Sequence, residues 1–324
     1  MKHTFPGFFD LQVNGFAGVD FNAPDLHPDH IDTAVRQLRR TGVTRCLPTL
    51  ITAPLAAFAR NARLLARSNH ALIAGLHMEG PYLSPDDGPR GAHPRDYISR
   101  GSADDFERRQ EAAEGRIVLV TLAPEVPGAL QLIEYLVARG VRVGLGHTAA
   151  TPAQLDAAIA AGASIATHLG NGCAQMLPRH PNGIWTLLAA DAVVASFIVD
   201  GHHLPDVTVK TMIRAKTVAR SILVTDAMSA AGSPPGIYPI GPVHGELDRT
   251  GRVSLPGTPY LAGSALTMPD AIANTVRFTG LPITEVVPMA CAVPARTLGI
   301  PVSGTVLAEW DNARKSLRVI EVVE

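Results

Sequence analysis

The sequence is poor in cysteine, which limits how its fold can be held together. Its 324 residues include only three cysteines, Cys46, Cys173 and Cys291. They are odd in number, widely spaced and form no Cys-x-x-Cys pair, so the sequence offers no disulfide framework. Unpaired thiols are typical of proteins in a reducing compartment, and we therefore expect a cytoplasmic location.

Long apolar runs and concentrated positive charge are also missing. No uninterrupted apolar span of about 18 residues occurs, and Asp10 interrupts the start before a signal-type apolar core develops. We therefore expect neither membrane insertion nor secretion. The net charge is −1, and no cluster of lysine and arginine could neutralise a run of phosphates. A nucleic acid is therefore not an expected partner.

The sequence does contain enough apolar residues for a substantial core, with 46% hydrophobic and 18% charged residues. Eight short apolar runs recur, most of them separated by stretches with helical spacing. This alternation is typical of parallel strands joined by crossover helices, and eight units predict an α/β fold, a closed (β/α)8 TIM barrel. The runs span residues 8–13, 44–47, 72–77, 117–122, 141–145, 164–167, 195–199 and 222–225.

Helical spacing is clearest after three of these runs. Residues 127–139 place four apolar side chains on one helical face. Thr151 and Pro152 predict an N-cap followed by proline at the first helical position. Residues 206–215 predict a third helix.

Two stretches depart from the alternation. Residues 227–264 are rich in glycine and proline and include a predicted hairpin at 245–255, so we expect a long loop over the barrel mouth. The tail reads as two short strands joined by a turn at Asp311-Asn312. The predicted division is a catalytic barrel over residues 5–300 and a reduced β appendage over residues 301–324.

Four side chains that can bind a metal ion or a proton follow four different predicted strands. Glu79 follows the third strand, His147 the fifth, His168 the sixth and Asp226 the eighth. The C-terminal ends of barrel strands meet at one mouth, where the active site of such a barrel lies. A single histidine at a strand end is more often structural, but four such residues at one mouth favour a catalytic site.

One carboxylate and two imidazoles are a common ligand set for catalytic Zn²⁺ or Fe²⁺, with a coordination position left for water. We therefore predict one divalent metal ion, held by Glu79, His147 and His168. Asp226 would take a proton from the water, whose pKa falls from about 15.7 toward about 7 on coordination. Without a metal, Asp226 could equally be a capping or loop-stabilising carboxylate. His77 shares a strand face with Glu79, and we expect it to support the site rather than to ligate the ion.

A set of short motifs, in order along most of the chain, points to a known family. The motifs are Pro6-Gly7-Phe8-Phe9-Asp10-Leu11-Gln12-Val13-Asn14-Gly15, His77-Met78-Glu79-Gly80-Pro81, Gly91-Ala92-His93, Thr121-Leu122-Ala123-Pro124-Glu125, Gly146-His147-Thr148, Thr167-His168-Leu169, Asp200-Gly201-His202-His203, Val224-Thr225-Asp226-Ala227 and Leu261-Ala262-Gly263-Ser264-Ala265-Leu266-Thr267-Met268. Through them the chain resembles the N-acetylglucosamine-6-phosphate deacetylases of the amidohydrolase superfamily. Any single motif is weak, whereas the ordered set is highly specific.

The resemblance implies hydrolysis of the acetamide of N-acetylglucosamine 6-phosphate, or of a close N-acetyl amino sugar phosphate, to acetate and the free amine. Most amidohydrolases carry His-x-His at the end of the first strand for a second metal ion, whereas this chain has Gln12-Val13-Asn14. The resemblance therefore implies a single ion. It also argues against dihydroorotase-like or hydantoinase-like activity, which uses the histidine pair with a modified lysine.

The resemblance further implies roles for residues that the sequence alone does not single out. His93 would polarise the acetamide carbonyl together with the metal ion and stabilise the oxyanion. On its own it would be interpreted as a surface histidine in a mobile loop. Asn171, Gly172, Arg179 and His203 would bind the sugar 6-phosphate. Since some phosphate contacts in this family come from the neighbouring subunit, a homodimer is implied.

Three departures from the family pattern keep alternatives open. After His168 the family usually has an aromatic residue and Asn-Ala-Met, whereas residues 170–173 here are Gly-Asn-Gly-Cys, which alters the wall of the sugar pocket. The segment before Pro6 and the C-terminal appendage are both shorter than in the family. A divergent amidohydrolase that deacylates another N-acyl amine is one alternative, and an inactive phosphosugar-binding barrel that acts as a sensor or scaffold is another. A metal-free phosphosugar isomerase is a weaker alternative, because it would not explain the glutamate and two histidines.

Overall fold

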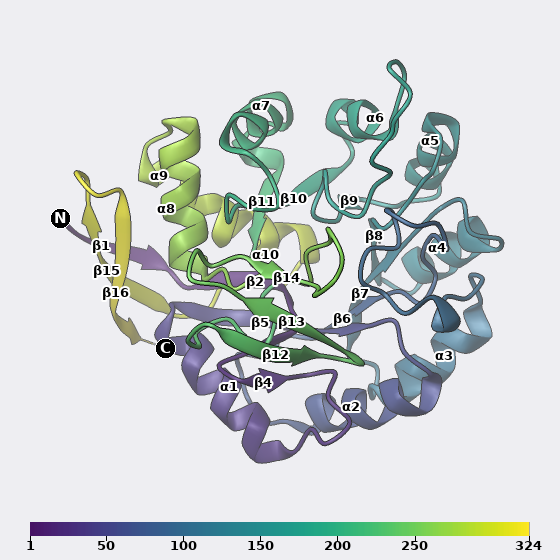
Figure 1. The fold of residues 1–324 in the computed structure, drawn as a ribbon, viewed down its shortest axis with the longest axis horizontal. Coiled ribbons are helices and arrows are strands. Elements are labelled where there is room, and N and C mark those ends of the chain that lie inside the picture. The colour runs from purple at the N-terminus through teal and green to yellow at the C-terminus, as the bar shows by residue number, and fades with distance from the viewer. Residues whose placement is uncertain (324) are drawn as a thin grey trace.

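Eight parallel strands form the centre of the protein. In the computed structural model, which describes residues 1–323, one sheet has the strand order β11-β10-β9-β8-β7-β6-β5-β2, with helices around it (Figure 1). This confirms the predicted barrel of the TIM type. The barrel strands are β2 (Phe8–Val13), β5 (Val43–Ile51), β6 (Leu76–Glu79), β7 (Ile117–Leu122), β8 (Arg142–Leu145), β9 (Ile165–Ala166), β10 (Val194–Ile198) and β11 (Ser221–Val224).

Helices follow every barrel strand, as crossover connections between parallel strands require. The α-helices are α1 (Pro28–Arg40), α2 (Leu55–Arg67), α3 (Ala103–Ala112), α4 (Ala129–Ala138), α5 (Pro152–Ala160), α6 (Gly183–Ala189), α7 (Asp206–Lys216), α8 (Met268–Thr279), α9 (Ile283–Val286) and α10 (Ala292–Leu298). Three short 3-10 helices are η1 (Arg95–Tyr97), η2 (Val218–Arg220) and η3 (Val287–Ala290). All three predicted helices are present, as α4, α5 and α7.

The cap predicted at Thr151 is a full capping box. The Thr151 hydroxyl accepts a hydrogen bond from the Gln154 backbone N–H at 3.4 Å, and the Gln154 side chain accepts one from the Thr151 N–H at 2.9 Å. Two backbone donors at the start of α5 are thereby satisfied. The helix is therefore fixed at the end that faces the barrel mouth.

Strands β2 and β11 close the barrel. Val13 and Ala227 form a parallel bridge, and the Asp10 carboxylate accepts hydrogen bonds from the Thr225 hydroxyl at 2.5 Å and the Thr225 N–H at 3.2 Å. These contacts join segments more than 200 residues apart in the chain, since Asp10 and Thr225 are separated by 215 positions. Closure brings the C-terminal ends of the first and last barrel strands together.

The third barrel strand begins later than the sequence predicts. The apolar run at residues 72–77 was expected to be the strand, but β6 spans Leu76–Glu79. Ile73 forms only an isolated bridge with Cys46, so the first half of the run is buried without joining the continuous ladder. The practical consequence is that Glu79 ends the strand itself rather than following it.

A three-stranded antiparallel meander covers the barrel mouth, and we call residues 236–262 the flap. It contains β12 (Gly236–Ile240), β13 (Val243–Leu247) and β14 (Val253–Ser254). The hairpin predicted at 245–255 is confirmed by the pairing of β13 with β14. The flap packs on a small hydrophobic cluster that is separate from the main core and that also contains Ile51, Met228 and Ala230.

A second small sheet lies at the side of the barrel, where both chain ends meet (Figure 1). The two predicted tail strands are β15 (Thr305–Asp311) and β16 (Ser316–Val323). Strand β1 (Lys2–Pro6) pairs with β15 in an arrangement that the sequence did not reveal.

The short strands β3 (Gly15–Phe16) and β4 (Val19–Asp20) form a separate hairpin. The division into two domains stays a prediction. No helix within residues 1–323 has the length and apolar character needed to cross a bilayer.

Candidate active site

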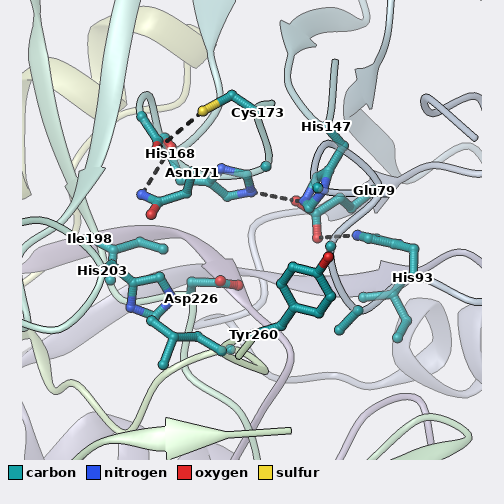
Figure 2. Close-up of a pocket in the computed structure, with 18 of the residues that line it drawn as sticks. Glu79, His93, His147, His168, Asn171, Cys173, Ile198, His203, Asp226 and Tyr260 are labelled. Atoms are coloured by element: carbon teal, nitrogen blue, oxygen red, sulfur yellow. Dashed lines mark hydrogen bonds and ion pairs between the residues drawn. The ribbon is translucent and has the colours of Figure 1, made fainter. Parts of the chain in front are cut away.

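The structure brings the four predicted strand-end residues together at one cavity (Figure 2). Glu79 is the last residue of β6, and His147, His168 and Asp226 each lie two residues beyond the end of their strands. The cavity has a volume of about 540 Å³. All four side chains line it, although each is at most 9% exposed.

Three of these residues present ligand atoms to a common point. Glu79 Oε1 lies 3.0 Å from His168 Nε2 and 3.4 Å from His147 Nε2. One ligand atom from each of the three residues lies within 4.8 Å of the others. Such close approach of a carboxylate and two imidazoles in a buried site is the donor set that a divalent metal ion prefers. The residues present therefore fit a metal ion.

Hydrogen bonds fix the orientation of this cluster. His147 Nδ1 lies 2.9 Å from the carbonyl oxygen of Pro89, so the ring donates through Nδ1 and leaves Nε2 as the ligand atom. Burial alone would raise the pKa of Glu79, but the neighbouring rings of His147 and His168 outweigh it and hold the pKa well below its usual value. Glu79 is therefore an ionised carboxylate, as metal ligation requires.

The backbone at three of these residues adopts a conformation that L-residues rarely take. The φ angles are 50° at His147, 30° at His168 and 50° at Asp226. A non-glycine residue in the left-handed region costs roughly 1–3 kcal/mol and persists only where its surroundings hold it. The barrel therefore maintains the same unfavourable turn after three strands, and each turn points a polar side chain into the mouth.

Gln12 and Asn14 occupy the positions where a histidine pair would hold a second metal ion, and they bind protein groups instead. Gln12 Nε2 donates to Glu79 Oε1 at 2.8 Å, and Asn14 Nδ2 donates to Asp226 Oδ1 at 2.7 Å. Amide side chains orient the carboxylates here. The number of ions that the site binds stays a prediction.

Asp226 is buried beside the cluster without belonging to it. Burial and the nearby charge of Glu79 raise the pKa of Asp226 from 3.8 to about 6, while the hydrogen bond from Asn14 lowers it. A carboxyl group that titrates near neutral pH can both accept and donate a proton during one reaction cycle.

His93 lies across the cavity mouth from Asp226, as the family motif implied. Its Nδ1 lies 3.0 Å from the Thr52 hydroxyl, and its Nε2 lies 3.6 Å from Glu79 Oε2. Burial lowers the pKa of His93 from 6.5 to about 3, so the ring is neutral. When the Thr52 hydroxyl donates to Nδ1, the ring proton is on Nε2, which faces the cavity.

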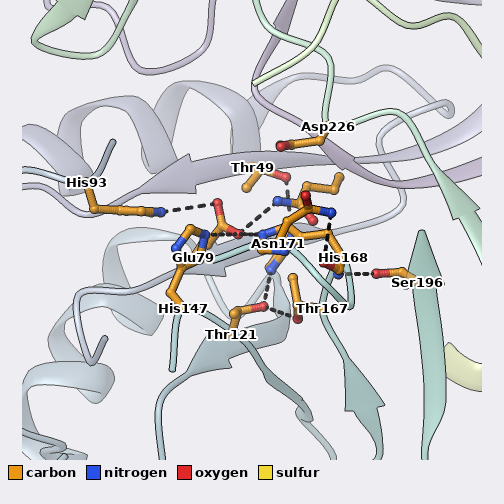
Figure 3. A network of polar contacts seen from close by, with 12 residues as sticks. Thr49, Glu79, His93, Thr121, His147, Thr167, His168, Asn171, Ser196 and Asp226 are labelled. Carbon is orange, nitrogen blue, oxygen red and sulfur yellow. Dashed lines mark hydrogen bonds and ion pairs between the residues drawn. The ribbon is translucent and has the colours of Figure 1, made fainter. Parts of the chain in front are cut away.

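His77 lies beneath the cluster and does not join it. Its Nε2 contacts the Thr121 hydroxyl at 2.8 Å. The Thr121 hydroxyl in turn contacts the Thr167 hydroxyl at 2.8 Å (Figure 3). These hydrogen bonds link His77 of β6 to Thr121 of β7, and Thr121 to Thr167, which directly follows β9. Burial lowers the pKa of His77 from 6.5 to about 4. A neutral ring one layer below the ligands agrees with the supporting role that we predicted.

The residues predicted to bind phosphate divide into two groups. Asn171, Gly172 and His203 line the cavity, and His203 Nδ1 is held at 2.6 Å by the Asp200 carboxylate. Arg179 is exposed in the loop between β9 and α6 and does not line the cavity of its own chain. Its role in phosphate binding stays a prediction.

Sequence reasoning missed three residues that line or shape the site. Thr52 orients His93, Asp200 orients His203, and Tyr260 lies in the cavity wall. The Asp200 contact has a sequence signal, since the two residues are three positions apart. Thr52 and Tyr260 have none, because their contacts depend on how the loops pack over the barrel.

Imidazole and carboxylate ligands at the C-terminal mouth of such a barrel are typical of metal-dependent hydrolases, and this is the class that the fold and the site define. Comparison with known proteins specifies it further. The pattern of the Amidohydrolase family matches residues 4–310. The chain therefore belongs to the amidohydrolase family, and within it to the group that contains the N-acetylglucosamine-6-phosphate deacetylases.

The relatives that place the chain in this group cover most of its length. It is 36% identical over 300 residues to the N-acetylgalactosamine-6-phosphate deacetylase of Escherichia coli O157:H7, a match that covers 91% of this chain and 78% of that protein. It is 34% identical to the N-acetylglucosamine-6-phosphate deacetylase of Vibrio furnissii, over 91% of this chain and 73% of that protein.

Solved structures agree with this placement. A variant of the N-acetyl-D-glucosamine-6-phosphate deacetylase of Mycobacterium smegmatis, in complex with N-acetyl-D-glucosamine-6-phosphate, superposes with a TM-score of 0.91 at 33% identity, over 99% of this chain and 86% of that chain. The enzyme from Pasteurella multocida gives a TM-score of 0.89 at 28% identity, over 99% and 85% of the two chains. The fold and family that the sequence motifs predicted are confirmed.

Proposed function

We propose that the protein hydrolyses the acetamide of N-acetylglucosamine 6-phosphate, or of a close N-acetyl amino sugar phosphate, and releases acetate and the amino sugar phosphate. The observation that carries this proposal is the meeting of Glu79, His147, His168 and Asp226 at one buried cavity. The substrates in the names of the relatives support the phosphorylated N-acetyl amino sugar.

The site holds one divalent ion in this proposal, zinc or iron, bound by Glu79, His147 and His168. The mixed carboxylate and imidazole set suits both metals. Support for a single ion comes from Gln12 and Asn14, whose amide groups bind the Glu79 and Asp226 carboxylates where a second ion would need ligands.

The reaction follows from the protonation states of the side chains. The ion, when bound, would polarise a water molecule and lower its pKa. Asp226 accepts a proton from the water, whose oxygen then bonds to the acyl carbon, and Asp226 later donates that proton to the amine nitrogen as the C–N bond breaks. His93 is neutral, and its Nε2–H donates a hydrogen bond to the carbonyl oxygen as negative charge develops there.

The sugar phosphate occupies the other end of the cavity in this proposal. The backbone N–H of Gly172, the side chain of Asn171 and the ring of His203 bind the phosphate oxygens. The Asn171 N–H itself already donates to the carbonyl oxygen of His168 at 2.9 Å. Arg179 completes the site from a second copy of the chain. The exposure of Arg179, and of the apolar side chain of Met176 in the same loop, supports a homodimer. Three free cysteines support action in the reducing cytoplasm.

A hydrolysis assay tests the proposal. Acetate release is measured from N-acetylglucosamine 6-phosphate, N-acetylgalactosamine 6-phosphate and their unphosphorylated forms, with the metal-loaded protein. We expect turnover of a phosphorylated sugar, and loss of at least about 100-fold in kcat for Asp226→Asn because the proton acceptor is gone. Metal content should be unchanged in this variant.

Other outcomes would favour the alternatives. Turnover of another N-acyl amine without turnover of either sugar phosphate would indicate a divergent deacylase. Tight sugar phosphate binding without any hydrolysis and without bound metal would indicate a sensor.

A further inference from the structure

Tyr260 is an aromatic residue in the cavity wall that the sequence motifs did not single out. It lies in the flap, directly before the Leu261–Met268 motif, and its side chain lines the cavity. Three other tyrosines donate their hydroxyl groups to protein acceptors, namely Tyr82 to Asp105, Tyr135 to Glu107 and Tyr238 to Pro234. Within residues 1–323 the Tyr260 hydroxyl has no such acceptor, and it is therefore available to a ligand.

The backbone of Tyr260 is fixed on both sides. Its carbonyl oxygen accepts a hydrogen bond from the Leu255 N–H at 2.9 Å, and its N–H donates to the Thr258 hydroxyl at 3.2 Å. Four residues later, the Ser264 N–H donates to the carbonyl oxygen of Asp226 at 2.9 Å. The segment that carries Tyr260 is thus tied to the turn that carries the proton acceptor.

The ring occupies a particular end of the cavity. Figure 2 shows it between Asp226 and His93, with the hydroxyl oxygen pointing toward Glu79, whereas His203 lies on the other side of Asp226. In the proposed function, His93 contacts the acyl carbonyl and His203 contacts the phosphate. Tyr260 therefore faces the acyl end of the substrate rather than the phosphate end.

We propose that Tyr260 binds the N-acyl group of the substrate, with its ring covering the acetamide and its hydroxyl hydrogen-bonded to a polar atom of that group. This inference rests on the proposed function and adds a residue to it. Filling the cavity removes water from the hydroxyl, and a polar group that loses water without gaining a partner is costly. The acetamide supplies that partner, and the bare amine of the product, which lacks the acyl group, does not.

The test compares Tyr260→Phe with Tyr238→Phe, a matched control in the same flap whose hydroxyl bonds only to Pro234. We expect Tyr260→Phe to lose about 3- to 10-fold in kcat/KM for the N-acetylated sugar phosphate, the range for one neutral hydrogen bond. Its inhibition constant for glucosamine 6-phosphate, which lacks the acyl group, should match that of the wild type. Tyr238→Phe should change neither quantity.

Two results would overturn the inference and leave the proposed function in place. An unchanged kcat/KM in Tyr260→Phe would show that the hydroxyl does not bind the acyl group. Equal losses in kcat/KM and in affinity for glucosamine 6-phosphate would assign Tyr260 to the sugar or to the structure of the flap. A wild-type protein that hydrolyses no N-acetyl sugar would overturn the proposed function together with this inference, so the two failures are distinguishable.

Discussion

At the scale of single residues, Asn14 is one of the groups that set the charge of Asp226. Burial raises the pKa of this carboxyl group, and the Asn14 amide opposes the shift by donating to Oδ1 at 2.7 Å. The proton acceptor must be ionised, so activity falls as the pH drops through the pKa of Asp226. The position of this acid limb is therefore a readout of the hydrogen bond.

We predict that Asn14→Leu moves the acid limb of kcat/KM to higher pH by about one to two units. A lost hydrogen bond to a charged group costs about 1.5–3 kcal/mol, and one pKa unit corresponds to about 1.4 kcal/mol. Both proteins hold the same metal ion, so its effect on Asp226 is common to the two profiles. A limb that stays in place or moves to lower pH would show that Asn14 does not stabilise the ionised form.

The sequence could predict the site residues that strand order brings together, but not those that loop packing brings to the site. Glu79, His147, His168 and Asp226 were predictable because strand order alone brings the ends of barrel strands together. Thr52 and Tyr260 were not, because a loop and the flap bring them to the site through tertiary packing. Arg179 was inferred only from the family resemblance, and it does not line the cavity of its own chain, so its role stays a prediction.

At the scale of elements, the flap packs on a hydrophobic cluster that is separate from the main core. Leu247 is 5% exposed and packs in this cluster with Ile240 and Val253. Ile51, at the end of β5, also belongs to this cluster, whereas most of the buried barrel residues pack in the main core. A change in this cluster should therefore loosen the flap before it unfolds the barrel.

We predict that Leu247→Ala speeds limited proteolysis within residues 236–262 and raises KM. Removing a buried leucine side chain costs about 2–5 kcal/mol, which is enough to populate an open flap. Ile237→Ala, on the exposed side of β12 at 68% exposure, is the control and should leave both quantities unchanged. A large drop in the melting temperature without faster cleavage would show that the flap and barrel unfold together.

The elements themselves were predictable to different degrees. Apolar runs buried on both faces identify parallel strands, and the Thr151 cap was visible in the sequence because its signal is local. The predicted start of β6 was wrong because Ile73 is apolar and buried but does not join the strand ladder. Strand β1 escaped detection because its partner, β15, lies about 300 residues away in the chain.

At the scale of the whole molecule, the proposed homodimer makes a prediction about shared active sites. Arg179→Met should raise KM for the phosphorylated sugar about 10- to 1000-fold, since a charged hydrogen-bonding partner is lost. Asp226→Asn should be inactive by itself. If Arg179 acts on the partner copy, mixing the two variants should restore part of the activity, because a mixed dimer contains one complete site.

Light scattering of the wild-type protein provides the accompanying measurement of mass. A monomer in solution, or no recovery of activity in a mixture that exchanges subunits, would contradict the assignment of Arg179 to the partner site.

The central claim is that one metal ion, held by Glu79, His147 and His168, is required for hydrolysis. The most direct measurement removes metal with a chelator and follows the return of acetate release from N-acetylglucosamine 6-phosphate as Zn²⁺ or Fe²⁺ is added in known amounts. Activity should vanish on chelation and return in proportion to added metal until it saturates at about one ion per chain, the capacity of a single three-ligand site. Full activity in the metal-free protein, or saturation only at two ions per chain, would contradict the account.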